Sequence, residues 1–429
     1  MIFLKSIQSK KQDLVILYYL LLGIIQAMWT NMSAFPPLPF RLLMIGAVVL
    51  PMVLKKEYIV FGVPFFMILR GQLATDYQYM PDVHSYGIYT VLLIGLLIIH
   101  RRTVTLKYLK VFTPMIILLV YMWIIDILGI NQCGEYVHNL LIAILYSLFL
   151  TSEKDVHVLS FSLISACALL SVYYILMYNQ FLEVWNKLEG IERSGWNDPN
   201  YFSTLLGVGF LLSALYVLGY IKTEMILCNR KLLILTMIAI FLAVVLTASR
   251  AGYIATSSIL IFTIIKSRPN ILKLLSTTCI IVLCVLIMYR CGIFDTLLYR
   301  LLEQGNLDTG GGRTDIWVRF IQNYKDQSYL NQIFGCGYWY RVQLSGGADM
   351  HNEFIAIWAD YGFIGLVFYL LLIFSMLLHY DKTFNIRIIA VVYYILMVVS
   401  LSPFQYVNVG FFIVWVLSVR LIACRQDII

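Results

Sequence analysis

The chain has 429 residues, of which 61% are hydrophobic and only 13% charged, and its mean hydropathy is +0.84. Because soluble globular proteins carry roughly 25% charged residues, this composition excludes an ordinary soluble protein of two or three domains. The formal charge of +8 does not indicate nucleic-acid binding, since membrane topology explains where the basic residues lie.

The N-terminal segment is predicted to be an uncleaved membrane helix. Lys5, Lys10 and Lys11 precede an apolar run from Leu14 to Trp29, a pattern that also occurs in signal peptides. No cleavage site with small residues follows the run, so we expect it to remain as the first transmembrane helix.

Apolar segments that approach the thickness of a bilayer recur along the whole chain. The third and sixth are short enough to be tilted or re-entrant, so we expect an all-α polytopic membrane protein with a bundle of about 12–14 transmembrane helices. The segments fall at about residues 14–30, 38–54, 58–73, 86–100, 111–130, 137–150, 156–178, 201–221, 231–248, 251–266, 271–289, 354–379, 386–402 and 405–423.

Lysine and arginine in the connections predict the orientation of the helices. With a cytoplasmic N-terminus, the inner connections carry 20 basic residues and the outer ones 10, while Arg41 lies within a span. This bias predicts that both termini are cytoplasmic. Eight of the outer ten are arginine, against 7 of the inner 20. Because a guanidinium suits the planar geometry of phosphate, the outer face is equipped to hold a phosphorylated ligand; alternatively, a translocated loop happens to use arginine.

The first long outer segment, 179–200, ends in Glu192-Arg-Ser-Gly-Trp-Asn-Asp-Pro-Asn200, directly before an apolar segment. Asp198 or Asn200 is suited to cap the helix that follows, with Pro199 in a turn or at the first helical position. A helix N-terminus presents backbone N–H groups and a positive dipole end, so together with Arg193 it would bind an anion. The alternative is an ordinary cap and turn.

Segments 231–248 and 251–266 are joined almost without a loop by Thr247-Ala-Ser-Arg-Ala-Gly252. One continuous helix would span about 54 Å, against a hydrocarbon core of about 30 Å, so the chain must turn near Ser249 and Arg250. Gly252 can supply a permissive backbone for that turn. Arg250 then lies at the outer membrane surface, either as a ligand for a lipid phosphate or as an interfacial anchor.

The longest polar segment, 290–353, contains Gly310-Gly-Gly-Arg-Thr-Asp315 and then apolar residues at helical spacing. We expect an amphipathic helix that lies on the membrane or over the site, with Arg313 at its entrance as a further phosphate ligand. A flexible linker followed by a lid helix is the alternative. In an oxidising compartment, Cys291 and Cys336 of this loop could also pair.

This polar loop ends in Asp349-Met-His-Asn-Glu-Phe354 at the mouth of an apolar helix. If Asp349 caps the helix, His351 lies in its first turn, where the positive dipole end lowers the pKa of the imidazole and keeps it neutral. A neutral imidazole can act as a general base, and Asn352 and Glu353 could orient the ring or the acceptor. The alternative is a solvent-facing histidine at a helix start. We expect no metal and no cofactor, because no ligand spacing for one occurs.

Five motifs, in this order, resemble the O-antigen ligase and polymerase family over residues 190–370. They are Arg193 with Asp198-Pro-Asn200, Ser249-Arg-Ala-Gly252, Gly312-Arg-Thr-Asp-Ile-Trp317, Phe334-Gly-Cys-Gly-Tyr338, and Met350-His-Asn-Glu-Phe354 with Ala359-Asp-Tyr-Gly-Phe-Ile-Gly365. The resemblance implies a membrane-embedded glycosyltransferase of the bacterial inner membrane, whose site lies on the periplasmic or outer face. It implies an undecaprenyl-diphosphate-linked oligosaccharide as donor, and a lipid-linked repeat or lipid A core as acceptor.

By the same resemblance, Arg193 and Arg250 would grip the donor diphosphate, Arg313 would assist, and His351 would activate the acceptor hydroxyl. We divide the chain into an N-terminal transmembrane bundle (1–180), a catalytic core (181–380) that includes the outer loop, and C-terminal transmembrane helices (381–429).

We favour a polymerase, with a chain-length regulator as a further partner, over a ligase, because nothing marks a dedicated core-oligosaccharide site. A transporter or flippase is the rival class, and it should show charges near mid-membrane and internal repeats. Arg41 and Asp126 instead lie near the outer ends of their spans, and no repeat is visible. A non-catalytic membrane protein would need neither His351 nor the arginines.

Overall fold

Every regular element that the described residues form is a helix. The computed structural model describes residues 2–32, 38–73, 82–101, 106–130, 135–177, 199–222, 229–247, 249–267, 289–290, 313–378, 381–402, 404 and 407–420. The helices are α1 (Ile2–Met32), α2 (Leu38–Leu54), α3 (Lys56–Leu73), α4 (Asp82–Ile99), the 3-10 helix η2 (Leu106–Phe112), α5 (Thr113–Ile127), α6 (Glu135–Ser147), α7 (Glu153–Leu176), α9 (Pro199–Val217), α10 (Arg230–Leu246), α11 (Arg250–Ser267), α14 (Arg313–Lys325), α15 (Tyr329–Phe334), α16 (Tyr338–Leu344), α17 (Glu353–Leu377), α18 (Phe384–Ser400) and α19 (Val407–Ser418).

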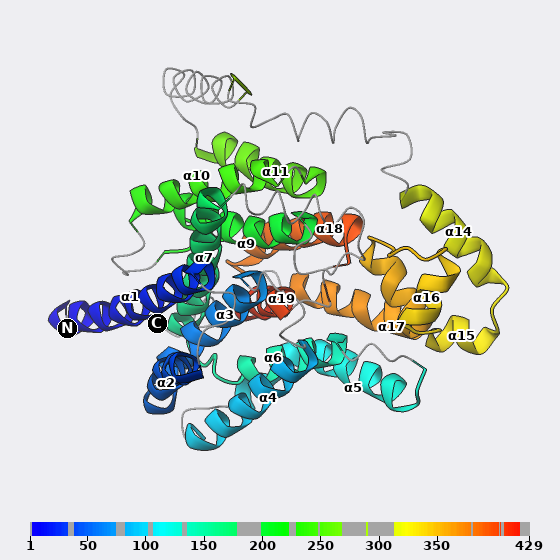
Figure 1. Cartoon of the computed structure of the whole chain (residues 1–429), viewed down its shortest axis with the longest axis horizontal. Coiled ribbons are helices and arrows are strands. Elements are labelled where there is room, and N and C mark those ends of the chain that lie inside the picture. Colours follow the sequence, from blue (N-terminus) through cyan, green and yellow to red (C-terminus); the bar gives the residue numbers. More distant parts are fainter. Residues whose placement is uncertain are drawn as a thin grey trace.

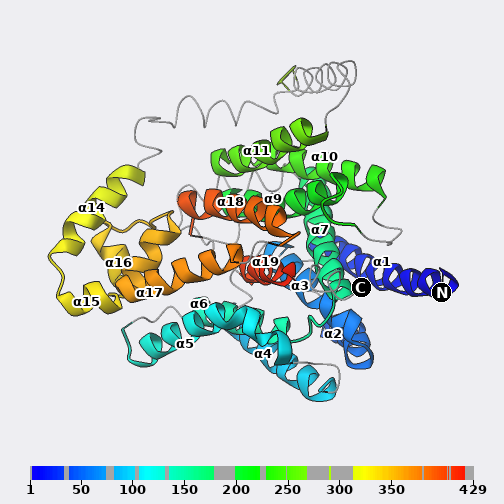
Figure 2. The same ribbon diagram turned by 180° about the vertical axis from the view of Figure 1, so that it is seen from behind.

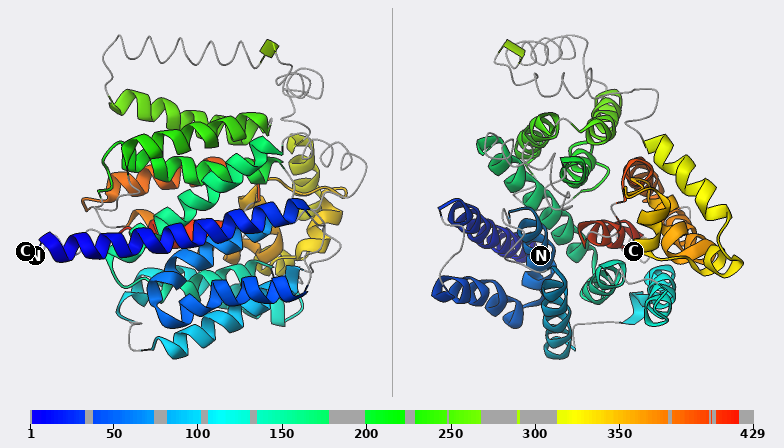
Figure 3. Two further views of the ribbon diagram at one scale, coloured as in Figure 1. Left: turned by 60° about the vertical axis from the view of Figure 1, so that its left-hand side comes forward. Right: turned by 45° about the vertical axis from the view of Figure 1, so that its right-hand side comes forward.

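The apolar helices form one bundle around a shared core. Helices α7 and α9 pack against each other in the interior, α10 and α11 cover α9, and α5 lies against α17 (Figure 1). The long helices run side by side, as Figure 3 shows. The short helices α14, α15 and α16 gather at one end of this bundle, and the start of α1 lies at the other end, as the view from behind also shows (Figure 2).

The outside of the bundle is apolar, as expected for a protein whose solvent is lipid. Large hydrophobic side chains of α2, α4, α5 and α10 are exposed, among them Leu43, Val91, Ile127 and Leu235. A soluble monomer rarely exposes so much apolar surface, whereas acyl chains cover it at no cost. The protein is therefore an all-α polytopic membrane protein, as the composition predicted.

Four described helices are long and apolar enough to cross a membrane by length and composition. They comprise Leu109–Ile127, Glu153–Leu176, Asn200–Val217 and Glu353–Leu377, and further apolar helices of the described part are shorter. The expected total of about 12–14 helices stays a prediction, because the apolar segment 271–288 lies outside the described residues.

Helix α17 is interrupted at Gly362, although the sequence predicted one continuous apolar segment. Gly362 has φ 70° and ψ −172°, a conformation that favours glycine. A side chain there, or on Gly335, would overlap the backbone of the other segment, so the two backbones approach closely. The Cys336 N–H donates to the Ala359 carbonyl at 2.8 Å. The residues before α17 are thus joined to the break in the helix.

Neighbouring groups bind the carbonyl oxygens that this break frees from the helix. The Tyr121 hydroxyl of α5 donates to the Tyr361 carbonyl at 2.7 Å, and the Tyr324 hydroxyl of α14 donates to the Trp358 carbonyl at 3.3 Å. Irregular backbone at membrane depth is tolerated only where protein or water satisfies it in this way. The first half of α17 is consequently held by α5, α14 and the residues that follow α15.

Candidate active site at the start of α17

His351 lies just before α17 in a backbone conformation that is rare for its residue type. Its φ is +46°, and it is the one non-glycine residue with positive φ among those the structure describes. Such strain costs about 1–3 kcal/mol and is often found at functional sites. Asn352 caps α17, with its Oδ1 accepting the Ile355 N–H at 3.2 Å. The prediction that Asp349 caps the helix is therefore wrong, and His351 precedes the first turn instead of lying in it.

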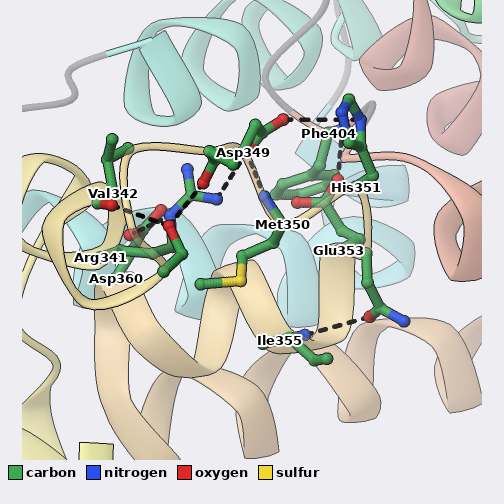
Figure 4. Close-up of polar contacts among 12 residues, drawn as sticks. Arg341, Val342, Asp349, Met350, His351, Glu353, Ile355, Asp360 and Phe404 are labelled. Atoms are coloured by element: carbon green, nitrogen blue, oxygen red, sulfur yellow. Dashed lines mark hydrogen bonds and ion pairs between the residues drawn. The ribbon is translucent and has the colours of Figure 1, made fainter. Parts of the chain in front are cut away.

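Asp349 links His351 to the protein interior. Its Oδ1 accepts from Arg341 Nη1 and from the Met350 N–H, both at 2.8 Å, and its Oδ2 lies 4.0 Å from His351 Nδ1 (Figure 4). Burial by itself raises the pKa of the Asp349 carboxyl, but Arg341, the His351 ring and these hydrogen bonds together hold that pKa below its ordinary value. Asp349 is thus a fixed negative charge beside a half-buried imidazole.

Arg341 of α16 occupies the centre of this network, and only 1% of it is exposed. Its Nε donates to Asp360 Oδ1 at 2.9 Å, and its guanidinium lies 4.8 Å from the centre of the Tyr338 ring. Burial alone lowers the pKa of this guanidinium, but Asp360 and Asp349 raise it well above its ordinary value. One permanently charged side chain therefore connects the loop of His351 to a carboxylate of α17.

Asn352 and Glu353 secure the start of α17 against the last two helices. Asn352 Nδ2 donates to the Val399 carbonyl at the end of α18, at 3.2 Å. Glu353 is fully buried, and its Oε2 accepts the Phe404 N–H at 2.8 Å. Both residues thus fix the backbone that carries His351.

Helix α14 crosses directly over this loop, in agreement with one of the two placements predicted for the amphipathic helix. Trp317 Nε1 donates to the Met350 carbonyl at 2.6 Å, and Phe320 packs with Met350 and Ala359 in a small second core. Arg313 Nη1 donates to the Ser400 carbonyl at 2.8 Å. Arg313 therefore ties α14 to the end of α18 at the same end of the bundle.

Asn200 and Arg250, which lie far apart in the sequence, are brought together where α9 and α11 begin. The chain turns between α10 and α11 as predicted, and Arg250 is the first residue of α11. Ser249 Oγ accepts the Gly252 N–H at 3.2 Å and donates to Asn200 Oδ1 at 2.9 Å. Ser249 thus caps α11 and also joins it to the first turn of α9.

Gly252 does not supply the permissive backbone that we expected for the turn before α11. It has no unusual φ, but a methyl group at this position would overlap the Ser203 side chain of α9. The glycine therefore permits close packing of two helices, not a turn. Asn200 is likewise not a cap, because α9 already begins at Pro199.

The first turn of α9 contacts both the residues at the start of α11 and the loop that holds His351. Asn200 binds Ser249, and the neighbouring Tyr201 donates through its hydroxyl to Asp349 Oδ2 at 3.4 Å. This turn connects the beginning of α11, with Arg250, to the loop that holds His351. Arg193 and Asp198 lie outside the described residues, so their positions relative to this turn stay predictions.

Sequence reasoning missed Arg341, Asp360 and Tyr201. Asp360 carried a signal, because a carboxylate inside an apolar segment requires a partner; nothing in the sequence identifies Arg341 as that partner. Cys336 is a free thiol whose Sγ donates to the Ala359 carbonyl at 3.3 Å, and burial raises its pKa to about 12. Cys291 lies outside the described residues. No group of three or more potential metal-ligating side chains occurs among the described residues.

A protein-family model described as O-antigen ligase matches residues 235–370. The match runs from α10 to beyond the break in α17 and includes Arg250, Arg313 and His351, and also the Arg341 network. Searches of curated proteins and of solved structures found no match. The chain thus resembles the O-antigen ligase and polymerase family, whose members are enzymes of the glycosyltransferase type.

Proposed function

We propose that this protein is a surface-polysaccharide polymerase of O-antigen or capsule. It transfers a glycan from an undecaprenyl-diphosphate-linked donor to a hydroxyl of an acceptor sugar. The observation that carries the proposal is the strained His351 beside Asp349, which is paired with the buried Arg341, within the region that matches the family. The acceptor is a second lipid-linked repeat, and a chain-length regulator is the expected protein partner.

His351 acts as the general base of this reaction. In this role its Nδ1 faces Asp349 Oδ2 at 4.0 Å, and its Nε2 accepts the proton of the acceptor hydroxyl. The negative charge of Asp349 stabilises the imidazolium that then forms, as carboxylates do in related constellations. Catalytic contacts are commonly looser before substrate binds, so we expect this separation to shorten in the complex with substrate.

Arginines bind the diphosphate that leaves. The acceptor oxygen forms a bond to the anomeric carbon while the bond from that carbon to the diphosphate oxygen breaks, with inversion. Arg250 at the start of α11 offers a guanidinium together with the N–H groups of a helix N-terminus. Arg193, in the connection before α9, completes this clamp. Arg313 has an assisting role, because its Nη1 is already bound to Ser400.

The α14–α16 end of the bundle faces the outside of the inner membrane in this proposal, and both termini are cytoplasmic. The basic residues support this orientation, since the connections assigned to the inner side carry 20 of them and the outer connections carry 10. Donors already activated by a diphosphate also suit a compartment without nucleotide sugars.

An O-antigen ligase is the second candidate, because the matching family model carries that description. It would use the same donor and the same site, and its acceptor would be lipid A core. Deletion of the gene separates the two functions when surface polysaccharide is run on a gel. A single repeat on the core indicates a polymerase, and long chains that remain lipid-linked indicate a ligase.

Complementation of the deletion strain tests the assigned residues. We expect His351→Ala, Arg250→Ala and Arg193→Ala to restore little polymer, although each protein is present in the membrane at the wild-type level. Full restoration by His351→Ala would refute the general-base role.

A further inference from the structure

Asp360 is a carboxylate buried inside a membrane-spanning helix, and the proposed chemistry does not use it directly. Its side chain is completely buried. Ionisable groups in such places are costly, and they commonly mark functional sites. Its partner, Arg341, belongs to a different helix, α16. The position of Asp360 therefore requires an explanation beyond the packing of α17.

Arg341 bridges two carboxylates with two different nitrogen atoms. Nε binds Asp360 at 2.9 Å and Nη1 binds Asp349 at 2.8 Å. A guanidinium is planar and rigid, so the two carboxylates are held at a fixed spacing, and the Tyr338 ring restricts the tilt of the plane. The position of Asp349 is thereby set by Asp360.

Asp360 is well suited to anchor the series of contacts that runs from Asp360 through Arg341 to Asp349. It lies just before the break at Gly362, where the backbones of Gly335 and Asp360 approach closely. On the other side, the carbonyl of Tyr361 is bound by Tyr121. The backbone on either side of Asp360 is therefore held by two separate parts of the protein.

Asp349 stands at the other end of this series of contacts, and its second oxygen, Oδ2, faces His351. A buried ion pair contributes little to stability compared with apolar side chains of the same volume. A role in stability alone therefore does not explain why the contacts lead from the helix break to the base. Fixing the orientation of the base does explain it.

We propose that Asp360 and Arg341 are positioning residues of the transfer reaction. Acting through Asp349, they hold a carboxylate oxygen toward the imidazole of His351. This inference rests on the proposed function, and it adds that a carboxylate within the membrane-spanning helix controls the rate without touching substrate.

A double-mutant cycle tests the proposal, with initial rates measured on purified protein in lipid nanodiscs. The substrate is the lipid-linked repeat extracted from the gene-deletion strain. We expect Asp360→Asn to lower kcat about 10- to 100-fold, the range for misplacement of a catalytic group, with KM for the repeat unchanged. In an Asp349→Asn background, the same substitution should cost less than about twofold, because coupled residues do not act additively.

Asp381→Asn is the matched control. Asp381 forms an ion pair with Arg387 at 3.1 Å beyond the other end of α17, so its loss removes a comparable pair far from His351. We expect kcat to stay within about twofold of wild type, as for an independent distant site. If Asp360→Asn does not accumulate in the membrane, Arg341→Lys replaces it in the cycle, since lysine keeps the charge but not the fork.

Additive losses in the cycle, or a loss in KM alone, would overturn the positioning role. That result is distinct from failure of the proposed function, which would appear as full activity of His351→Ala. An inactive His351→Ala together with additive Asp360 and Asp349 effects would reject only the present inference.

Discussion

The hydroxyl of Tyr201 donates a hydrogen bond to the carboxylate of Asp349 at 3.4 Å. This contact joins the first turn of α9, which also binds the cap of α11, to the loop that carries His351. The proposed base and the proposed diphosphate ligand Arg250 therefore share one structural support.

Loss of the Tyr201 hydroxyl should slow transfer without unfolding the protein. A hydrogen bond of this kind contributes about 0.5–1.5 kcal/mol, so we expect Tyr201→Phe to reduce kcat about two- to tenfold. Tyr216→Phe is the control on the same helix, because the Tyr216 hydroxyl contacts His157 Nδ1 at 2.9 Å, away from the site. Equal effects of the two substitutions on kcat would contradict the role given to α9.

The backbone strain at His351 should be measurable as a difference in stability between two variants of this residue. Because φ is +46°, glycine fits this position better than alanine, by about 1–2 kcal/mol. We expect His351→Gly to unfold at a higher temperature than His351→Ala in the same detergent, while both are inactive. A lower unfolding temperature for the glycine variant would show that the left-handed conformation is not maintained in the protein.

Close packing of α9 and α11 should make Gly252 sensitive to a single methyl group. Gly252→Ala would overlap Ser203, and overpacking of this kind costs about 1–3 kcal/mol. We expect a lower unfolding temperature, which Ser203→Gly in the same chain partly restores, because it removes both side-chain atoms that a methyl group on residue 252 would overlap. Gly95→Ala, at a glycine with no neighbouring atom within 4 Å, should not lower it.

The depressed pKa of Asp349 predicts how stability depends on pH. A carboxyl group with a lowered pKa in the folded state stabilises the protein above its unfolded pKa, about 3.9, and this contribution is lost as pH falls through the folded value. We expect the unfolding temperature of the wild type to fall with an acidic step below about pH 4 that Asp349→Asn lacks. Identical acid profiles would contradict the ionised Asp349–Arg341 pair.

The sequence predicted those features that depend on short-range pattern. The turn at Ser249 and Arg250 follows from helix length, and the amphipathic α14 follows from the spacing of Ile316, Phe320 and Tyr324. The prediction of Asp349 as the helix cap was wrong, because Asn352, three residues later, is of a residue type that caps equally well.

Long-range packing decided the remaining features. The break at Gly362 depends on the approach of Gly335, and glycine in an apolar run is equally compatible with a continuous helix. The bridge from Asp360 through Arg341 to Asp349 depends on how α16 lies against α17. Residue spacing in the sequence predicts neither the approach of Gly335 to Gly362 nor the bridge through Arg341.

Transfer by the purified protein tests the central claim most directly. Wild-type protein in nanodiscs is supplied with lipid-linked repeat from the deletion strain, and both products are measured. The account predicts elongated lipid-linked glycan, with one undecaprenyl diphosphate released for each glycosidic bond formed. It also predicts that His351→Ala forms both products about 10²- to 10⁴-fold more slowly, the usual contribution of a general base. Wild-type rates from His351→Ala would contradict it.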